Sequence, residues 1–499
     1  MNQSMHTNEI FERARLSRDA RFDGHFFIGV KTTGIYCRPI CPANSPKSEN
    51  ITFYTSAAAA GEAGFRPCLR CRPECAPGTP AWHGTSTTVR RGLRLIASGA
   101  LDDGNIEQLS DRLGVTSRHL RRLFTQHLGA SPLAVAHTQR LHFAKSLIDQ
   151  TKLPMQEIAV AAGYGSVRRF NDTFRNTYGR TPRDLRRNDC KAHGAASGEQ
   201  ASLSVRLNYR RPFQWSQLIT FMRGRAIPGV ETVVDDRYLR TVRVGDQVGV
   251  VEVGHNEKEQ CLSLSLHGID TSNLFPVVQK VREIFDLDAP VGDIGAVLKK
   301  DDVLKARLKS MPGIRVPGAW DGFELTIRAI LGQQVSVKAA TTLSGRLAAR
   351  YGESVARVID EQMSAAGLSY LFPTPEKLMR ARCNNMGLVG ARAETIRRVA
   401  RAVFDRELSF DPSQDPEAFH ASLTSIKGIG DWTAQYVAMR ALKNPDAFPA
   451  SDLGLLRAFD RDGEDRMRAN ELALLSESWR PWRAYAALLL WSSTPNSGG

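Results

Sequence analysis

Several features are absent from this sequence, and each absence excludes a class of protein. No apolar run approaches the roughly 20 residues that a membrane-spanning helix needs. The N-terminal stretch carries acidic residues and lacks the apolar core of a secretory signal. Cysteine is scarce outside one short region, whereas a secreted disulfide scaffold is small and evenly rich in cysteine. We therefore expect a cytoplasmic protein that uses no membrane partner.

Acidic residues are also fewer than basic residues. Lys and Arg total 67 against 52 Asp and Glu, a formal net charge of +15, so nucleic acid or another polyanion is the natural partner. Residues 81–190 hold 17 basic and 9 acidic side chains, which is about half of the excess. Apolar residues make up 42% of the 499, a globular composition, and this length predicts about three domains.

Five of the eight cysteines lie between positions 37 and 75. Cys37 and Cys41 form one close pair, and Cys68 and Cys71 form another after 26 intervening residues. Two such pairs are typical of a closed tetrahedral zinc site, because each pair can chelate the metal from a tight turn. Cys75 is surplus to four ligands. The spacing alone predicts a structural zinc ion, and free cysteines without a metal are the alternative.

The residues around these cysteines point to a chemical role. Val30–Pro39 (VKTTGIYCRP) and Ala63–Cys71 (AGFRPCLRC) resemble the N-terminal domain of the Ada-type methylphosphotriester-DNA–protein-cysteine methyltransferases, over about Phe22–Pro73. The resemblance implies that Cys37 is both a zinc ligand and the methyl acceptor. Zinc keeps a thiolate nucleophilic at neutral pH, and the thioether product is not readily demethylated, so each protein would accept one methyl group.

Methylation would also change the charge of this site. Four thiolates on zinc carry a formal charge of about −2, which becomes about −1 when one of them is methylated. Less negative charge repels DNA less, so the resemblance implies a damage-driven increase in DNA affinity.

Residues 81–190 contain an internal repeat. Leu109–Ser117 (LSDRLGVTS) recurs 49 residues later as Ile158–Ser166 (IAVAAGYGS), and each copy predicts a helix, a glycine turn and a recognition helix. The tandem pattern resembles AraC-type transcription regulators over about Thr87–Arg187. Basic residues expected on the exposed face of the recognition helices, and therefore to bind DNA, are Arg118, Arg121, Arg122, Arg168, Arg169 and Arg175.

The chain changes character after a polar, Gly- and Ser-rich linker at about 188–202. A helix is predicted at Trp215–Arg223, and the region from about residue 271 onwards is helical. Strands are predicted at Leu203–Tyr209, Tyr238–Val244, Gly249–Val253 and Cys261–Leu266.

A Gly-x-Gly turn enters a helix within Leu423–Ala434 (LTSIKGIGDWTA). Gly428 and Gly430 tolerate positive φ and let a DNA phosphate approach the N–H groups at the helix N-terminus. With its flanking isoleucines, this segment resembles the helix-hairpin-helix of base-excision DNA glycosylases. About 20 residues later, Asp452 stands where that superfamily carries its essential aspartate. The alternative for an aspartate at a helix start is an N-cap.

The resemblance extends over nearly all of Leu203–Thr494. Pro212–Trp215 (PFQW), Arg328–Ser336 (RAILGQQVS) and Trp479–Trp482 (WRPW) are similar to 3-methyladenine DNA glycosylase II, the AlkA type. This resemblance implies excision of N3- or N7-alkylated purines without a cofactor. It also implies an aromatic pocket that receives the flipped, cationic base. Gln334 stands where the best-known relatives wedge an apolar residue into the duplex. The matching pocket positions are Phe221, Trp432, Tyr436 and Trp491.

Two further absences narrow the reaction. Glycosylases that also cleave the DNA backbone use a lysine where this chain has Trp432, and no cysteine follows Cys383 to hold an iron–sulfur cluster. We therefore expect monofunctional base excision. The sequence also lacks a Pro-Cys-His-Arg run, which predicts no O6-alkylguanine transfer.

The combined prediction is a multidomain α+β chain that repairs alkylated DNA and regulates the response to it. Its expected partners are one zinc ion, double-stranded DNA in the nucleoid and RNA polymerase, and it is expected to be a monomer. The alternative is a transcription regulator whose glycosylase part only binds DNA. The expected domains are 1–80, a small zinc domain; 81–190, an all-α tandem helix-turn-helix domain; 202–300, an antiparallel β domain; and 301–499, an all-α helix-hairpin-helix glycosylase domain.

Overall fold

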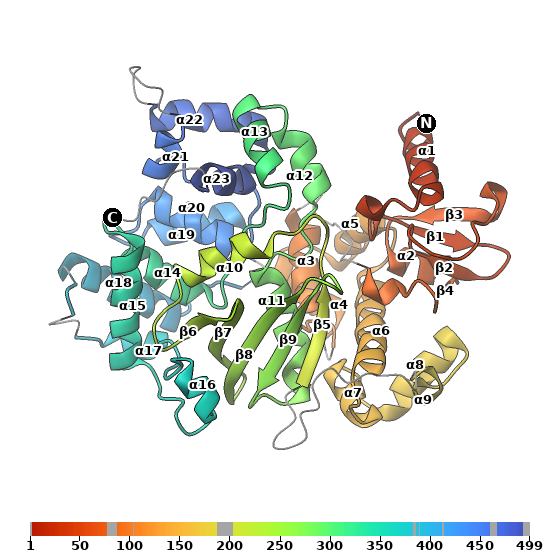
Figure 1. Ribbon diagram of the computed structural model, residues 1–499, viewed down its shortest axis with the longest axis horizontal. Coiled ribbons are helices and arrows are strands. Elements are labelled where there is room, and N and C mark those ends of the chain that lie inside the picture. The colour runs from red at the N-terminus through yellow and green to blue at the C-terminus, as the bar shows by residue number, and fades with distance from the viewer. Residues whose placement is uncertain are drawn as a thin grey trace.

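The computed structural model describes most of the chain (Figure 1). The linker predicted at 188–202 lies wholly outside the described residues, as do Cys190 and Cys383. The described residues are 2–76, 87–102, 104–186, 203–382, 386–388, 390–411, 414–459 and 467–492.

The N-terminal unit is built around a four-stranded sheet. Its elements are α1 (Asn2–Leu16), β1 (Phe27–Val30), β2 (Ile35–Cys37), β3 (Ile51–Tyr54), α2 (Ala57–Glu62) and β4 (Arg66–Pro67). The strand order is β3-β1-β2-β4, and only the β2–β4 pair is parallel. Cys37 ends β2 and Cys68 directly follows β4, so this pairing brings the two cysteine pairs together. No pattern in the sequence predicted this sheet, because its strands are two to four residues long.

The second unit is helical, as predicted. Its helices are α3 (Thr87–Ala97), α4 (Ile106–Leu113), α5 (Ser117–Leu128), α6 (Pro132–Gln150), α7 (Met155–Ala161), α8 (Val167–Tyr178) and α9 (Pro182–Leu185). The repeat is confirmed as two helix-turn-helix copies, α4–α5 and α7–α8. Their turns contain Gly114 and Gly163 at φ +68° and +74°, a conformation that glycine adopts without strain. α6 connects the two copies.

A five-stranded antiparallel sheet opens the second half of the chain, in the order β5-β9-β8-β7-β6. The four predicted strands and the predicted helix are confirmed. The additional strand, β6, is short and carries a buried glutamate, so it lacks an alternating pattern. The elements are β5 (Leu203–Asn208), α10 (Trp215–Arg223), β6 (Glu231–Val234), β7 (Arg237–Val244), β8 (Gln247–Asn256) and β9 (Cys261–His267).

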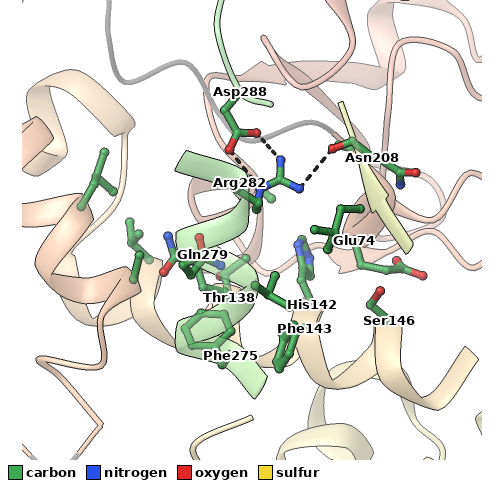
Figure 2. Close-up of a pocket in the computed structure, with 18 of the residues that line it drawn as sticks. Glu74, Thr138, His142, Phe143, Ser146, Asn208, Phe275, Gln279, Arg282 and Asp288 are labelled. Carbon is green, nitrogen blue, oxygen red and sulfur yellow. Dashed lines mark hydrogen bonds and ion pairs between the residues drawn. The ribbon is translucent and has the colours of Figure 1, made fainter. Parts of the chain in front are cut away.

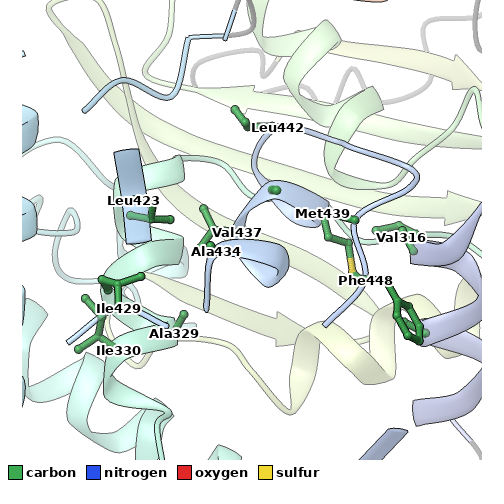
Figure 3. Packing of buried hydrophobic residues seen from close by; sticks show 14 of the residues in the cluster. Val316, Ala329, Ile330, Leu423, Ile429, Ala434, Val437, Met439, Leu442 and Phe448 are labelled. Carbon is green, nitrogen blue, oxygen red and sulfur yellow. The ribbon is translucent and has the colours of Figure 1, made fainter. Parts of the chain in front are cut away.

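The rest of the described chain is helical. It comprises α11 (Leu274–Ile284), α12 (Val291–Leu298), α13 (Asp302–Ser310), α14 (Gly322–Leu331), α15 (Val337–Tyr351), α16 (Glu361–Ala365), α17 (Pro375–Met379), α18 (Gly390–Phe404), α19 (Pro416–Thr424), α20 (Asp431–Arg440), α21 (Leu453–Arg457), α22 (Ala469–Ser476) and α23 (Arg483–Trp491). Figure 3 shows part of its core, where Ile330 of α14, Leu423 of α19 and Val437 of α20 are fully buried. Ile429 in the α19–α20 turn belongs to the same core, which fixes the hairpin.

One hydrophobic cluster crosses from the first half of the chain to the second. Leu147 of α6 and Phe174 of α8 belong to the same cluster as Leu207 of β5 and Val278 of α11. The second helix-turn-helix copy and the antiparallel β domain therefore share a core, although a linker was predicted between them. Among the described helices, none is long and apolar enough to cross a membrane.

Polar contacts also join the two halves. Arg94 of α3 pairs with Glu283 of α11, Nε to Oε1 at 3.1 Å, and its Nη1 donates to the Leu442 carbonyl at 2.6 Å. Near this interface, α6, β5 and α11 contribute to the wall of a cavity of about 340 Å³ (Figure 2). The lining of this cavity contains neither Asp452 nor any of the four paired cysteines, so the chemistry predicted from the sequence lies elsewhere.

Candidate functional site

The first candidate site is the cysteine cluster. The sulfur atoms of Cys37, Cys41, Cys68 and Cys71 all lie within 4.8 Å of one another. Tetrahedral zinc with bonds of about 2.3 Å separates its sulfur ligands by about 3.8 Å, so these four residues fit such an ion. Cys75 does not belong to the cluster.

The four thiols could not all ionise without a cation among them. The Cys41 sulfur raises the pKa of Cys37, whereas a hydrogen bond from Cys37 lowers the pKa of Cys41 to about 7. One thiol therefore ionises at the expense of its neighbour, because adjacent negative charges repel. A bound divalent cation removes this conflict, which agrees with a metal site.

Arg38 holds the two sides of the cluster together. Its backbone N–H donates to Cys71 Sγ at 3.3 Å, and its Nη1 donates to the Cys71 carbonyl at 3.0 Å. Its Nε donates to Asp23 Oδ1 at 2.8 Å. The residue directly after Cys37 thus positions the loop that carries the second cysteine pair.

Ion pairs connect this loop to α6 of the helix-turn-helix unit. Arg72, next to Cys71, pairs with Asp149, Nη2 to Oδ2 at 2.6 Å. Lys145 pairs with the same carboxylate at 2.5 Å and with Glu74 at 3.6 Å. Lys145, Asp149 and Glu74 are almost inaccessible to water, whereas Arg72 is partly exposed, so removing a partner of one of these three would leave a buried charge.

A second contact to α6 involves the residue before Cys37. The Tyr36 hydroxyl lies 2.9 Å from His142 Nε2. Burial lowers the pKa of His142 to about 4 and raises the pKa of Tyr36. Since the imidazole is therefore neutral and the phenol protonated, the Tyr36 O–H donates to the ring nitrogen.

The arginines predicted to face DNA are all exposed. On the opposite faces of the same helices, Leu120 and Phe124 of α5, and Phe170 and Phe174 of α8, are fully buried. Each recognition helix is therefore fixed by its apolar side and offers its basic side to a ligand. The exposed set comprises Arg118, Arg121 and Arg122 on α5 and Arg168, Arg169 and Arg175 on α8.

The two hairpin glycines have different roles. Gly428 has φ +101°, and a Cβ there would lie 2.0 Å from Thr395 Oγ1, so only glycine fits. Positive φ at Gly430 is not observed: its φ is −105°, and it is the N-cap of α20. No side chain caps this end of α20, which leaves the first N–H groups available to a phosphate.

Asp452 is held by two indole groups. Its Oδ2 accepts a hydrogen bond from Trp432 Nε1 at 2.7 Å, and its Oδ1 accepts one from Trp491 Nε1 at 2.8 Å. Oδ1 also accepts from the Leu455 N–H at 3.0 Å, so Asp452 is the N-cap of α21. The capping alternative is thus confirmed, and the same carboxylate lies among the predicted pocket residues.

The predicted pocket residues form a row, which we call the aromatic pocket: Trp491, Trp432, Tyr436 and Phe221. Tyr436 stacks on Trp432 with ring centroids 5.2 Å apart and an interplanar angle of 7°, and its centroid is 6.3 Å from that of Trp491. Phe221 lies beyond Tyr436, with the Arg440 guanidinium between them, 5.4 Å from Tyr436 and 5.1 Å from Phe221.

Two arginines of this site were not predicted. Arg225 Cζ lies 3.9 Å from the Phe221 ring centroid, and Arg440 donates to the Tyr436 hydroxyl at 2.5 Å. Each stands four residues after the aromatic residue that it contacts, a spacing that places side chains together on a helix. That spacing is the signal that could have indicated them.

Gln334 lies at the apex of the loop between α14 and α15, exposed and with φ +56°. Its neighbour Val335 is also exposed. Gln333 fixes the loop to the hairpin, because its Nε2 donates to the Gly428 carbonyl at 3.1 Å and lies 3.3 Å from Thr433 Oγ1. The loop therefore projects beside the hairpin, as a wedge would require.

Family models match four successive parts of the chain. They describe the metal binding domain of Ada over residues 11–74, a helix-turn-helix domain over 109–188, the AlkA N-terminal domain over 204–321, and the HhH-GPD superfamily of base excision DNA repair proteins over 327–484. A Mycobacterium tuberculosis protein named probable bifunctional transcriptional activator/DNA repair enzyme AlkA is 40% identical over 481 residues, which cover 96% of this chain and 95% of that protein. This chain belongs to the family of bifunctional AlkA-type transcriptional activator/DNA repair proteins.

Each half of this AlkA-type chain also matches a separate relative. DNA-3-methyladenine glycosylase 2 of Escherichia coli is 33% identical over 57% of this chain and 95% of its own length. The Escherichia coli bifunctional transcriptional activator/DNA repair enzyme Ada is 40% identical over 24% of this chain and 32% of its own length. The predicted fusion and multidomain fold class are confirmed.

A solved structure agrees with the fold of the second half. The 3-methyladenine DNA-glycosylase from Archaeoglobus fulgidus has a TM-score of 0.50 and 24% identity, covering 58% of this chain and 97% of that one.

Proposed function

We propose that this protein hydrolytically excises N3- and N7-alkylated purines from DNA and accepts, once, a methyl group from a DNA methylphosphotriester on Cys37. The observation that carries the excision is the Asp452 carboxylate, which two indole N–H groups hold at one end of the aromatic pocket. A glycosylase of this class needs a carboxylate beside the sugar and aromatic faces around the flipped base.

The proposed excision breaks the bond between the base and sugar C1′. Both bonding electrons leave with the base, the sugar becomes oxocarbenium-like, and the negative charge of Asp452 stabilises it. A water oxygen then bonds to C1′ and loses a proton to solvent. Trp432 stands where a lysine would replace water as the nucleophile, so the DNA backbone stays intact. In this proposal the hydrolysis uses no cofactor.

The proposed methyl transfer uses the most accessible part of the cysteine cluster. Cys37 and Cys41 are partly exposed, whereas Cys68 and Cys71 are buried. The Cys37 sulfur attacks the methyl carbon, the carbon–oxygen bond breaks, and its electron pair restores the phosphodiester. One zinc ion held by all four cysteines would keep these sulfurs deprotonated at neutral pH.

The exposed arginines on α5 and α8 would bind a promoter. The protein, as a monomer on that promoter, would recruit RNA polymerase and so regulate transcription. Gln334 would fill the gap left by the flipped base, supported by Val335 beside it. The glycines Gly428 and Gly430 would let the hairpin bind the phosphate backbone next to the lesion.

Incubation with methylated duplex DNA tests the excision. We expect free 3-methyladenine in the supernatant and an abasic, uncleaved strand. DNA binding without release of any base would instead favour the alternative, a regulator whose glycosylase part only holds DNA. Cleaved strands from purified protein would contradict monofunctional excision.

A further inference from the structure

The cavity between the two halves of the chain belongs to neither candidate site. Its volume of about 340 Å³ lies within the range of small-molecule sites, roughly 300–1,000 Å³. Its walls come from α3 and α6 of the helix-turn-helix unit and from β5 and α11 of the second half. A molecule bound there would therefore contact both halves at once.

Apolar side chains form much of the cavity wall. Leu93 and Ala97 line it from α3, and their spacing of four residues places them on one face of that helix. Phe143 of α6 lies beside Phe275 of α11, with ring centroids 4.8 Å apart (Figure 2). Such a wall favours a ligand with an apolar body, because contact with it removes apolar surface from water.

The charged side chains of the wall are nearly all paired. Glu74 and Arg206 have partners outside the wall, at 3.1 Å in Arg72 and at 2.9 Å in Glu259. The ion pairs within the wall are Arg94 with Glu283, Lys443 with Asp286, and Arg282 with Asp288. These charges cancel, so they leave no preference for a charged ligand.

Arg90 is the exception. It lines the cavity from α3, one turn before Arg94, and it makes neither a hydrogen bond nor an ion pair with any residue that the structure describes. Burial, and after it the charge of Arg94, lower the pKa of Arg90 to about 10, so the guanidinium remains protonated at neutral pH. A cation withdrawn from water without a partner costs free energy. The wall therefore carries one uncompensated positive charge.

We propose that this cavity binds a monocarboxylate with an apolar body. The planar guanidinium of Arg90 matches the two oxygens of a carboxylate, and the apolar body would lie along α3 over Leu93 and Ala97. One negative charge balances the one free cation, whereas a neutral molecule would leave Arg90 without a partner. This site is independent of both reactions proposed above.

Isothermal titration of the full-length, zinc-loaded protein with decanoate tests the site. We expect saturable binding of one decanoate per chain, and a melting temperature that rises with decanoate concentration because the ligand binds only the folded state. 1-Decanol has the same chain without the charge. It should bind at least about tenfold more weakly, since it lacks the hydrogen bond between two charged groups.

Two variants locate the carboxylate. Arg90→Gln should weaken decanoate binding by roughly tenfold to a hundredfold, the loss expected for a hydrogen bond to a charged group, and should leave decanol binding unchanged. Arg206→Gln is the matched control, because Arg206 lines the same cavity but its charge is already neutralised by Glu259. Its affinity for decanoate should stay within about twofold of the wild type.

A purely structural role of Arg90 predicts a different result. Since its guanidinium has no partner to lose, the ligand-free Arg90→Gln protein should melt no lower than the wild type. If that variant does not fold, Arg90→Met removes the same charge and keeps an apolar stem, and the same loss of decanoate binding is expected.

Three results would each overturn the proposal. The first is no saturable binding of decanoate to the wild type, as for a cavity that holds only water. The second is equal affinity of the wild type for decanoate and decanol. The third is wild-type affinity for decanoate in a folded variant that lacks the charge of Arg90.

Discussion

The cysteine cluster and the aromatic pocket are assembled over very different lengths of chain. All four cysteines of the cluster lie within residues 37–71, as two local pairs. The pocket combines Phe221 of α10, Trp432 and Tyr436 of α20, Asp452 and Trp491, so it exists only after the β domain and most of the helical domain have packed. A metal site made of chelating pairs depends on short spacing, whereas a pocket depends on tertiary structure.

The two sites also differ in what one reaction does to them. In the proposed reactions, methyl acceptance would convert Cys37 irreversibly into a thioether, whereas base excision would leave Asp452 unchanged for the next turnover. Variants that inactivate one site and spare the other are therefore the direct way to sharpen this comparison.

The largest expected effect is the loss of methyl acceptance in Cys37→Ala. The variant has no sulfur at the position proposed to attack, so intact mass spectrometry after incubation with methylated DNA should find no added methyl group. Release of 3-methyladenine should stay near the wild-type rate. Cys75→Ala is the matched control, since Cys75 lies outside the cluster, and it should still accept one methyl group. A methylated Cys37→Ala protein would assign the acceptor to another residue.

Metal binding should disappear almost as completely when half of the cluster is removed. Cys68→Ser combined with Cys71→Ser takes away two buried thiolates, and we expect the one zinc ion per wild-type chain to be absent by elemental analysis. Cys261→Ser, which removes a buried cysteine of β9, should keep its zinc. Full zinc content in the double variant would show that the metal lies elsewhere.

Asp452→Asn should slow base release by about a hundred- to a thousandfold, since it removes the charge that faces the developing sugar cation. The amide keeps an oxygen that can accept one indole N–H, so the fold should survive. Single-turnover release of 3-methyladenine measures the effect, and methyl acceptance at Cys37 should be normal. Release within about twofold of the wild type would mean that Asp452 serves only as the N-cap of α21.

Methylation of Cys37 should change DNA affinity more modestly. It removes one negative charge from a cluster that ion pairs connect to α6, and we expect tighter promoter binding by roughly fivefold to tenfold at low salt. Titrations of methylated and unmethylated protein at several salt concentrations measure this. A difference that does not shrink with added salt would point to a conformational rather than an electrostatic switch.

The smallest expected effect concerns the independence of the two halves. A fragment that starts near residue 202 contains the whole aromatic pocket and should release alkylated purines nearly as fast as the full chain. Its melting temperature should be several degrees lower, because Leu207 and Val278 lose the partners that α6 and α8 supply. A folded but inactive fragment would show that the N-terminal half takes part in excision.

Much of this architecture could be predicted from the sequence. Both helix-turn-helix copies follow from the repeat at residues 109–117 and 158–166, because glycine turns and buried positions recur together. Four strands of the second sheet were predicted from their β-rich sequences, several of which have alternating apolar residues. The short strands β1 to β4 escaped prediction, since two to four residues give no period, and so did the core that α6 shares with β5, which no local pattern encodes.

The two candidate sites also differ in how they could be predicted from the sequence. Spacing alone predicted the cysteine cluster, but the aromatic pocket required resemblance to a family. Neither route predicted Arg225, because an arginine after a helix usually lies in solvent and its four-residue spacing from Phe221 was not used as a signal. Both hairpin glycines can tolerate positive φ, but only Gly428 adopts it, and only there would a Cβ meet a neighbouring side chain.

The length of α6 has a consequence for the DNA sequence that this protein can regulate. Its 19 residues form a rod about 28 Å long, close to the roughly 34 Å of one turn of DNA. One recognition helix lies near each end of α6, so this helix fixes both the distance and the relative orientation of α5 and α8. If α5 and α8 bind the operator as proposed, we expect the two positions that they contact to lie about one turn apart on the same side of the double helix. Inserting about five base pairs between them would turn the second position to the opposite side, where α8 cannot follow.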